Sequence, residues 1–587
     1  MPSRGRRRVV ITGLLAPVAV VALAGGWSAH LGLSVRDHLE AARSALLQLR
    51  AVTSTRDPAL MGRALADAQR HAAEARRLTA GAYWTMMTHA PLVGAGATTV
   101  RGLAETAAEL TDVLTAVQRA AAAFVTVKAH SPDSTPELLT ELGAAAPVLD
   151  EAAGRLARAG SRLAATPAET GVDLLDQARD TALHEVDRLR GWLAGAATAG
   201  ALLPPMLGRD GPRHYFLAFQ TNAESRGTGG LVGAFGILRA DHGKIGIKRL
   251  SANSGLAPSP APVADHGPDF LARYGPSAVT LLSNSNLSPH FPYAAATWTG
   301  LWEHNTGRRL DGALATDPVG LSYLLQVIGP ITLPGGETVT AENVVDLTER
   351  TAYARYTDPV ARKRFLIRVA GAVSEALPES FAEPSKLLPV LLRMVGERRI
   401  QVWSRRPAEQ SRLAATAVGG VLPRRPGPFA GLVVNNSAGG KLDYYLERSL
   451  DYELDQCWGG LRSATVRVRL TNDVPRGSLP GYVTSRLDSP ERPHAPGSNL
   501  LWVSLYAGVG AELRAVRLDG DRIPVIEEDE RSHPVYSTLL EFAPRQSRTL
   551  EFDLMESSSG APPLVPVQPL VRPQRTRVVA DTRGCTP

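Results

Sequence analysis

A repeating pattern of Leu, Val and Ala runs through residues 34–205, and it restricts this part of the chain to helices packed side by side. Apolar residues recur there at alternating spacings of four and three residues. The repeated residues are Leu103, Ala107, Leu110, Leu114, Val117, Ala121 and Phe124, then Leu142, Ala145, Leu149, Ala152, Leu156, Ala159 and Leu163, then Leu175, Ala178, Ala182, Val186, Leu189 and Leu193. This spacing places them on one stripe of a helix, as in antiparallel coiled-coil hairpins or helical bundles. The sequence therefore predicts a helical stalk over residues 34–205.

Three pairs of residues in this region predict helix starts. Asp57-Pro58, Thr135-Pro136 and Thr166-Pro167 each place a capping residue before a proline at the first helical position. Glu169 completes a capping box with Thr166. We interpret the stalk as a spacer, and the alternative is a docking rod for a helical partner.

The run from Val9 to Leu33 contains no charged residue other than His30 when it is protonated, and four arginines precede it. As a helix it would reach about 37 Å, enough to cross a hydrocarbon core of about 30 Å. We predict a basic cytoplasmic tail over residues 1–8, a transmembrane anchor over residues 9–33 and an extracytoplasmic position for the rest, in a single-pass protein of the cell membrane. The alternative is a cleaved signal peptide, because Ala22-Leu23-Ala24 resembles a cleavage site.

Charge and cysteine content exclude several classes of protein. The formal charge is +7, of which the four N-terminal arginines supply +4, so the rest of the chain carries only 7 − 4 = +3. This balance does not indicate a partner nucleic acid. The two cysteines, Cys457 and Cys585, exclude a disulfide-dense scaffold and a cysteine zinc cluster. Because thiols tend to oxidise outside the cytoplasm, we predict a disulfide between them.

A polar, glycine-rich segment, Thr221–Gly230, lies between buried-strand patterns over His214–Gln220 and Gly233–Ala240. We interpret it as a loop at the end of a strand, where α/β sheets place ligand sites. Its predicted anion-binding residues are Asn222, Gly229 and Gly230. Arg226 would donate paired hydrogen bonds to a phosphate there. The alternative is a glycine-rich turn in which Glu224 and Arg226 pair with each other.

Further candidates follow along the chain. Asp317 precedes Pro318 and either caps a helix or points toward the site. Four arginines form a basic cluster, for which pyrophosphate is a natural target and a solvated helix face the alternative. They are Arg350, Arg355, Arg362 and Arg364. Four aromatic residues could stack on sugars, although their spacing favours core packing. They are Phe291, Tyr293, Trp298 and Trp302.

The region of about residues 205–380 resembles two protein families. The run from Phe219 to Gly233 reads Phe-Gln-Thr-Asn-Ala-Glu-Ser-Arg-Gly-Thr-Gly-Gly-Leu-Val-Gly and resembles the signature of domain-of-unknown-function family 4012, and the pair Asp311 and Asp317 agrees with it. The order of strand, polar loop, strand, Asp-Gly-x-x-x-x-Asp and Tyr-x-Arg before a basic helix resembles the LytR–CpsA–Psr family more distantly. Those are membrane-anchored, extracytoplasmic α/β enzymes that transfer glycopolymers from polyprenyl-pyrophosphate carriers to the cell wall. The resemblance implies an α/β domain over residues 206–425.

The last third of the chain reads as strands. After a hinge-like linker over Leu422–Pro428, apolar and charged residues alternate in three runs, and Asp519-Gly520 predicts a tight hairpin turn. The apolar members are Val466, Val468 and Leu470, then Leu501, Val503 and Leu505, then Leu550, Phe552 and Leu554. This pattern predicts an antiparallel, immunoglobulin-like β-sandwich over residues 429–587.

The predicted fold class is therefore multidomain α+β, with a transmembrane helix, a helical stalk, an α/β domain and a β-sandwich. The family resemblance implies a protein that binds, and in its stronger form transfers, a polyprenyl-pyrophosphate-linked glycopolymer. Glu224, Arg226 and Asp317 would then be catalytic, and Asp311 and Asp317 would hold a divalent cation such as Mg²⁺. The alternative is a non-catalytic envelope scaffold or binding protein with a vestigial pocket.

Overall fold

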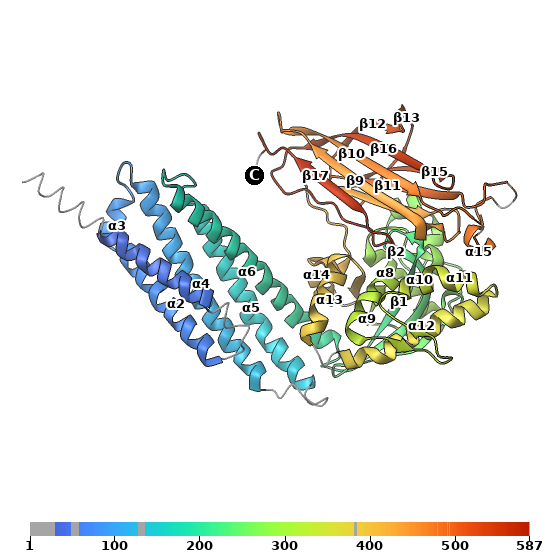
Figure 1. The fold of residues 1–587 in the computed structure, drawn as a ribbon, viewed down its shortest axis with the longest axis horizontal. Coiled ribbons are helices and arrows are strands. Elements are labelled where there is room, and N and C mark those ends of the chain that lie inside the picture. Colours follow the sequence, from blue (N-terminus) through green and yellow to red (C-terminus); the bar gives the residue numbers. More distant parts are fainter. Residues whose placement is uncertain are drawn as a thin grey trace, which may run out of the picture. The chain divides into compact units, whose positions relative to one another are not determined.

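The computed structural model describes residues 30–48, 58–126, 135–380, 384–477, 479–489, 491 and 493–585. The chain divides into two compact units, Met1–Arg209 and Asp210–Pro587 (Figure 1). The first unit is helical. The second contains both the α/β region and the β-rich region, which the sequence predicts as separate domains.

The transmembrane anchor predicted over residues 9–33 is not found. Most of that run, like the basic tail over residues 1–8, lies outside the described residues. Among the residues that the structure does describe, no helix is both long and apolar enough to cross a membrane. The helical residues 30–48 include Arg36, Asp37, Glu40 and Arg43. The predicted fold class is therefore wrong in its first element.

Long helices running side by side form the first unit (Figure 1). They are a helix over residues 30–48, α2 (Pro58–Thr79), the short α3 (Ala82–Met87), α4 (Gly94–Thr126), α5 (Thr135–Ala164) and α6 (Asp173–Met206). Val113, Leu156, Val186 and Leu193 join α4, α5 and α6 in one cluster. On α5, most residues that the heptad spacing places in the seam are buried, among them Ala152, Leu156 and Leu163, whereas Leu142 and Leu149 are half-buried.

Two of the three predicted helix starts agree with the structure, and the third does not. α2 begins at Pro58 and α5 at Thr135. Thr166-Pro167 does not start a helix, since α6 begins only at Asp173. The Thr166 hydroxyl instead donates to the Leu163 carbonyl oxygen at 2.7 Å, at the end of α5. A threonine hydroxyl satisfies a helix end of either kind, and here the carbonyl at the C-terminal end is the closer partner.

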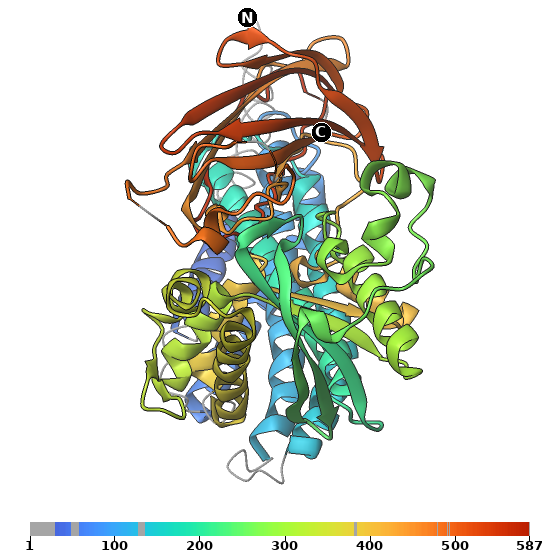
Figure 2. The ribbon, with the colours of Figure 1, turned by 90° about the vertical axis from the view of Figure 1, so that its right-hand side faces the viewer.

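A five-stranded sheet organises the first part of the second unit. Its strands are β1 (Arg213–Arg226), β2 (Gly229–Asp241), β3 (Lys244–Ala252), β4 (Gly312–Thr316) and β7 (Ile400–Ser404), in the order β3-β2-β1-β4-β7. Only the β1–β4 pair is parallel. The sheet lies between two groups of helices (Figure 2). On one side α8 (Phe291–Thr306) packs Trp298 against Phe216, and on the other α9 (Pro318–Ile328), α12 (Pro359–Ser380) and α13 (Pro384–Gly396) form a second cluster.

Two packed sheets form the rest of this unit. One has the order β14-β15-β11-β8 and the other β13-β12-β16-β10-β9-β17. The strands are β8 (Ala430–Asn436), β9 (Leu446–Leu454), β10 (Leu461–Asn472), β11 (Asn499–Ala507), β12 (Glu512–Leu518), β13 (Asp521–Arg522), β14 (Ile526–Glu530), β15 (His533–Phe542), β16 (Ser547–Ser557) and β17 (Arg575–Ala580). The nine apolar residues of the three alternating runs all lie in the core between the sheets. The sandwich is not wholly antiparallel, because β17 pairs with β9 in parallel.

The predicted hinge at Leu422–Pro428 is held on both sides. The Leu422 N–H donates to His290 Nδ1 at 3.1 Å, and its carbonyl oxygen accepts from Arg531 at 3.0 Å. The Pro423 carbonyl oxygen lies 2.6 Å from His533 Nε2. These bonds tie the segment to the α/β region and to the sandwich at once, so it does not act as a free linker.

Candidate functional site

The glycine-rich segment between the first two strands is not an open loop. β1 continues to Arg226 and β2 begins at Gly229, so the segment forms a β-hairpin with a bulge. Pairing passes from Thr221–Leu231 directly to Ser225–Gly230, which leaves residues 222–224 of β1 without partners on β2. A bulge of this kind turns the unpaired residues out of the ladder. They are the centre of the signature that the sequence analysis singled out.

Buried carboxyl groups bind the backbone that the bulge exposes. The two oxygens of Glu349 accept from the Asn222 N–H at 3.2 Å and the Ala223 N–H at 2.8 Å. Asp443 accepts from both the N–H and the hydroxyl of Ser225, each at 2.7 Å. Glu349 belongs to the segment before α11 (Ala352–Arg355), and Asp443 to the turn that leads into β9 in the sandwich. The bulge therefore lies between the two halves of the second unit.

Glu224 and Arg226 pair with each other, and a third residue completes the cluster. Arg226 Nη2 donates to Glu224 Oε1 at 2.8 Å, and Lys441 Nζ binds the other carboxylate oxygen. Arg226 also donates to the carbonyl oxygens of Ser225, Ser283 and Asn436. All three charged side chains are less than a tenth exposed. We call Glu224, Arg226, Lys441, Glu349 and Asp443 the signature cluster.

Burial and ion pairing act in opposite directions on these carboxyls. Burial would raise the pKa of Glu224, but the charges of Lys441 and Arg226 hold that pKa below its ordinary value. Burial raises the pKa of Glu349 to about 8, against the two N–H bonds, which lower it. Burial also raises the pKa of Asp443. Cations therefore stabilise Glu224 as a carboxylate, whereas no Lys or Arg side chain of the described residues forms an ion pair with Glu349.

Two glycines let the hairpin fit closely against its surroundings. A Cβ atom on Gly230 would lie 2.2 Å from the Thr221 carbonyl oxygen, and one on Gly227 would lie 2.2 Å from that of Leu287. Asn286 donates to the Gly230 carbonyl oxygen at 2.8 Å. Gly230, which the sequence analysis proposed for anion binding, thus serves the approach of backbone to backbone, as Gly227 does. Gly229, at φ +142, lies against Pro569 and Gln220 rather than against open space.

The structure places the two predicted metal-binding aspartates at opposite ends of β4. Asp317 caps α9 by accepting from the Gly320 N–H at 2.8 Å, and its other oxygen accepts from Arg399 at 2.8 Å. Asp311 accepts from the His214 N–H at 2.8 Å. Six residues along a strand span about 20 Å, so one ion cannot bind both carboxylates. In the part of the chain that the structure describes, no group of three His, Cys, Asp or Glu side chains is arranged to hold a metal.

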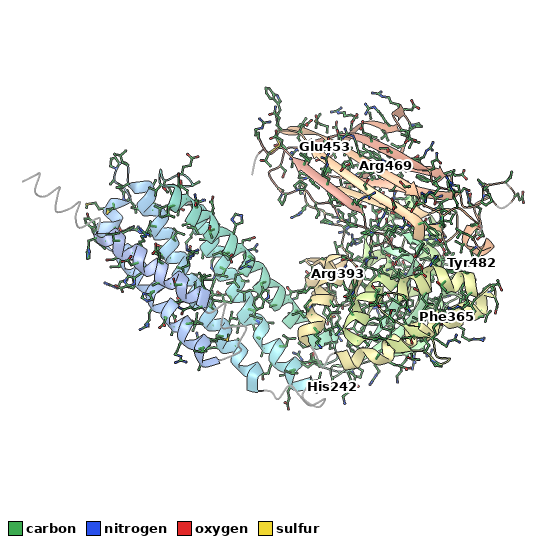
Figure 3. The ribbon with its side chains drawn as sticks, in the orientation of Figure 1. His242, Phe365, Arg393, Glu453, Arg469 and Tyr482 are labelled. Carbon is green, nitrogen blue, oxygen red and sulfur yellow. A yellow bond between two sulfur atoms is a disulfide. The ribbon has the colours of Figure 1, made fainter. Side chains whose placement is uncertain are left out.

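The four arginines of the predicted basic cluster do not come together on one ligand. Arg350 pairs with Asp346, and Arg355 with Glu337, both at the surface. Arg364 is exposed. Arg362 is buried, and its guanidinium lies 3.8 Å from the ring centre of Tyr482, a residue labelled in Figure 3.

Arg362 instead joins the two halves of the unit, as the bulge does. Its Nη1 donates to the Tyr356 carbonyl oxygen at 3.1 Å. The rings of Tyr353, from α11, and Tyr482, from α15 (Gly481–Thr484), are stacked with centres 5.8 Å apart. The guanidinium therefore contacts an aromatic pair contributed by the α/β region and the sandwich region.

The aromatic residues considered for sugar stacking lie inside the α/β region. Phe291 and Trp298 are fully buried, and Trp302 is 6% exposed. Trp298 donates through its indole N–H to the Ser285 hydroxyl at 2.7 Å. Tyr293 lies 4.5 Å from the His290 ring centre. Core packing accounts for this set, as the helical spacing favours.

Cys457 and Cys585 form a disulfide in the structure. Cys457 lies between β9 and β10, and Cys585 follows the last strand, β17. The Cys457 N–H also donates to the Arg583 carbonyl oxygen at 2.9 Å. The bond fixes the end of the chain to the sandwich.

The sequence analysis missed Lys441, Asp443 and Glu349. Each lies between about 120 and 220 residues from its partner in the bulge. One signal was available for Lys441. Only six lysines occur in the chain, and Lys441 follows the strand pattern of residues 430–436 directly after two glycines. Nothing in the sequence pairs Glu349 or Asp443 with the bulge.

Comparison with known proteins bears on the same region. No curated protein matches the chain. The family match does not show the distant LytR–CpsA–Psr resemblance, which stays a prediction. Residues 210–353, which include the whole β1–β2 hairpin, match the family described as Protein of unknown function (DUF4012), and this confirms the sequence-based prediction of a DUF4012 domain.

Proposed function

We propose that this protein is a non-catalytic scaffold of the extracytoplasmic space, in which the DUF4012 signature joins the α/β region to the β-sandwich. One observation carries the proposal. The Asn222, Ala223 and Ser225 N–H groups and the charged side chains of the bulge, which an anionic ligand would use, are hydrogen-bonded within the protein, to Glu349, Lys441, Asp443 and Asn436. A ligand that bound there would first have to break these buried bonds.

The stronger alternative, glycopolymer transfer, requires a different arrangement. A transferase stabilises the charge of a diphosphate with cations that are free to approach it. Here the guanidinium of Arg226 already binds one carboxylate and three carbonyl oxygens. Arg355 pairs with Glu337 at the surface, and Asp317 is used by α9 and Arg399. These contacts favour the scaffold.

The disulfide supports an extracytoplasmic position for the protein. Disulfides persist in oxidising environments and are rare where thiols are kept reduced. The bond between Cys457 and Cys585 therefore favours an extracytoplasmic position for the sandwich.

An Arg226→Ala variant tests the proposal against transfer. The scaffold predicts a clear loss in the free energy of unfolding, measured in urea, and no change in the affinity for undecaprenyl pyrophosphate measured by titration. The matched control is Arg412→Ala, which removes an exposed arginine of α14 (Pro407–Ala414) in the same region. An Arg226→Ala protein of unchanged stability that loses binding of the lipid pyrophosphate would contradict the scaffold and favour the transferase.

A further inference from the structure

A groove opens on the outer face of the four-stranded sheet, and no residue of the signature cluster lines it. Its volume is about 440 Å³, within the range of small-molecule sites. β11, β14 and β15 line it, and Arg273 of α7 (Pro268–Tyr274) closes one side. None of the residues that the sequence analysis proposed as site residues lines this groove.

Trp502 forms a fixed aromatic wall of the groove. The Arg273 guanidinium lies 4.7 Å from its ring centre, and the ring of Tyr274 meets it edge-on at 5.7 Å. On β15, Leu539 lies directly opposite Trp502 in the sheet. Because cation and ring contacts hold the indole, it offers a flat apolar surface at little entropic cost.

Exposed apolar side chains extend this surface. Leu539 and Ile526 are each 59% exposed, and both line the groove. Ile526 lies opposite Ser537 in the sheet, on the edge strand β14. An edge strand that carries an exposed isoleucine beside a half-buried tryptophan has apolar surface that the protein itself does not cover.

Polar groups stand beside the apolar wall. Arg273 Nη2 donates to the hydroxyls of Ser504 at 2.8 Å and Ser537 at 3.1 Å, and Nη1 binds the carboxylate of Glu528. Glu528 is about a quarter exposed at the groove, and Thr538 also lines it. The groove therefore combines a flat ring with a carboxylate, a guanidinium and hydroxyl groups.

The groove offers no unpaired cation to an anionic ligand. Among the residues that line it, Arg273 is the cation and Glu528 the carboxylate, and the two are paired. Glu530, 3.9 Å from Arg273, is buried and is not among the lining residues. The charges of the lining residues therefore cancel, which suits a neutral ligand better than a phosphate or an acidic peptide.

We propose that this groove binds a neutral saccharide. The apolar CH face of a sugar ring matches the indole of Trp502 and the side chains of Leu539 and Ile526. Its hydroxyl groups donate to the Glu528 carboxylate and accept from the side chains around it. The proposal goes beyond the scaffold, since the groove and the signature cluster share no residue.

A Trp502→Ala variant of the full chain tests the proposal. An array of neutral tetrasaccharides, namely glucans, mannans, galactans and acetylated chitin fragments, identifies the best ligand, and calorimetric titration measures its affinity. We expect Trp502→Ala to weaken binding at least tenfold, about 1.4 kcal/mol. The matched control is Trp458→Ala, which removes a tryptophan of the same sandwich that is 83% exposed and should leave affinity unchanged.

A second variant separates binding from folding. Leu539→Arg places a long charged side chain in the groove. Because position 539 is exposed, the variant should unfold at the same midpoint as the wild type. Its affinity for the saccharide should fall at least tenfold, as in Trp502→Ala. The proposal is overturned if no saccharide of the array binds, or if binding survives both groove variants. Binding that is confined to unstructured peptides would overturn it as well. None of these results changes the Arg226→Ala test, so the two proposals can fail separately.

Discussion

A buried charge is stable only beside its partner, and Lys441 is one of the two cations that hold Glu224. Lys441→Met removes that cation and leaves the carboxylate buried with Arg226 alone. We expect the free energy of unfolding of the second unit to fall by about 3–5 kcal/mol in urea, the usual cost of breaking a buried pair. Arg355→Ala is the matched control, because the Arg355–Glu337 pair lies at the surface and should contribute about 1 kcal/mol or less. If both variants lost the same free energy of unfolding, the buried Lys441–Glu224 pair would contribute no more than the surface pair of Arg355 and Glu337.

Glu349 gives the second unit a pH dependence of defined sign. Its pKa is about 8 in the folded protein against an ordinary value of 4.5, so the folded state holds an extra proton between those values. Stability therefore falls as the pH rises through this window and levels off above about pH 8. Burial lowers the pKa of His290 from 6.5 to about 2. Between these values the unfolded chain binds the proton more strongly, so this residue makes the protein more stable as the pH rises toward about 6.5. The effect of Glu349 is thus clearest from pH 6.5 to 8, at about 1–2 kcal/mol.

The Glu349→Gln variant isolates this effect. Glutamine does not titrate, so the decline in the urea midpoint between pH 6.5 and 8 should become smaller. The variant should also be less stable than the wild type at pH 6.5, because the amide nitrogen of the glutamine would face a backbone N–H as donor against donor. We expect this to lower the free energy of unfolding by about 1–3 kcal/mol. An unchanged pH profile in Glu349→Gln would mean that this carboxyl is ionised throughout the range.

At the scale of elements, the β1–β2 hairpin depends on glycine where backbone meets backbone. Gly230→Ala would place a methyl group 2.2 Å from the Thr221 carbonyl oxygen, and we expect a loss of about 2 kcal/mol or more in the free energy of unfolding. Gly246→Ala, in β3 of the same sheet, has no atom within 4 Å of the added carbon. It should be neutral or stabilise by about 0.5 kcal/mol, because alanine restricts the unfolded chain. Thermal unfolding measures the difference in stability between the two variants. If Gly230 lay in a flexible loop, the two variants would be equally stable.

Helices and strands that follow from the spacing of nearby apolar residues could be predicted from the sequence. The bulge in β1 could not, because it depends on residues far away in the chain. The buried stripe of α5 and the alternation of Val466, Val468 and Leu470 follow from helical and strand periods, which the sequence displays directly. The Thr221–Gly230 segment has the composition of a loop, so its strand character was missed. That character depends on Glu349 and Asp443, whose positions only the complete fold determines.

The candidate site shows the same division between local and distant causes. The pairing of Glu224 with Arg226 was one of two interpretations left open, since residues two apart can reach each other. The choice between them required Lys441, which is 217 residues away from Glu224. The groove at Trp502 was not predicted, because Arg273 and the edge strand β14 meet only after the sandwich has formed.

At the scale of the whole molecule, the disulfide closes a loop of 128 residues. Loop-closure entropy predicts a stabilisation of roughly 4–5 kcal/mol relative to the reduced chain. Reduction should therefore lower the urea midpoint without changing the far-ultraviolet circular dichroism of the native protein. A Cys457→Ser, Cys585→Ser double variant serves as the control and should not respond to the reductant. If protein isolated under native conditions carries two alkylatable thiols, the bond does not form.

The central claim is that the signature of the DUF4012 domain is a structural joint within one unit. Hydrogen exchange followed by mass spectrometry tests it most directly, because exchange reports the opening free energy of each segment. The Asn222, Ala223 and Ser225 amides donate to buried carboxyl groups, so a peptide spanning residues 221–226 should exchange as slowly as peptides from β10 in the sandwich core. Lys441→Met should accelerate exchange in both peptides together. Exchange of residues 221–226 within seconds in the wild-type protein, while β10 stays protected, would contradict the account and show that the signature is an open loop.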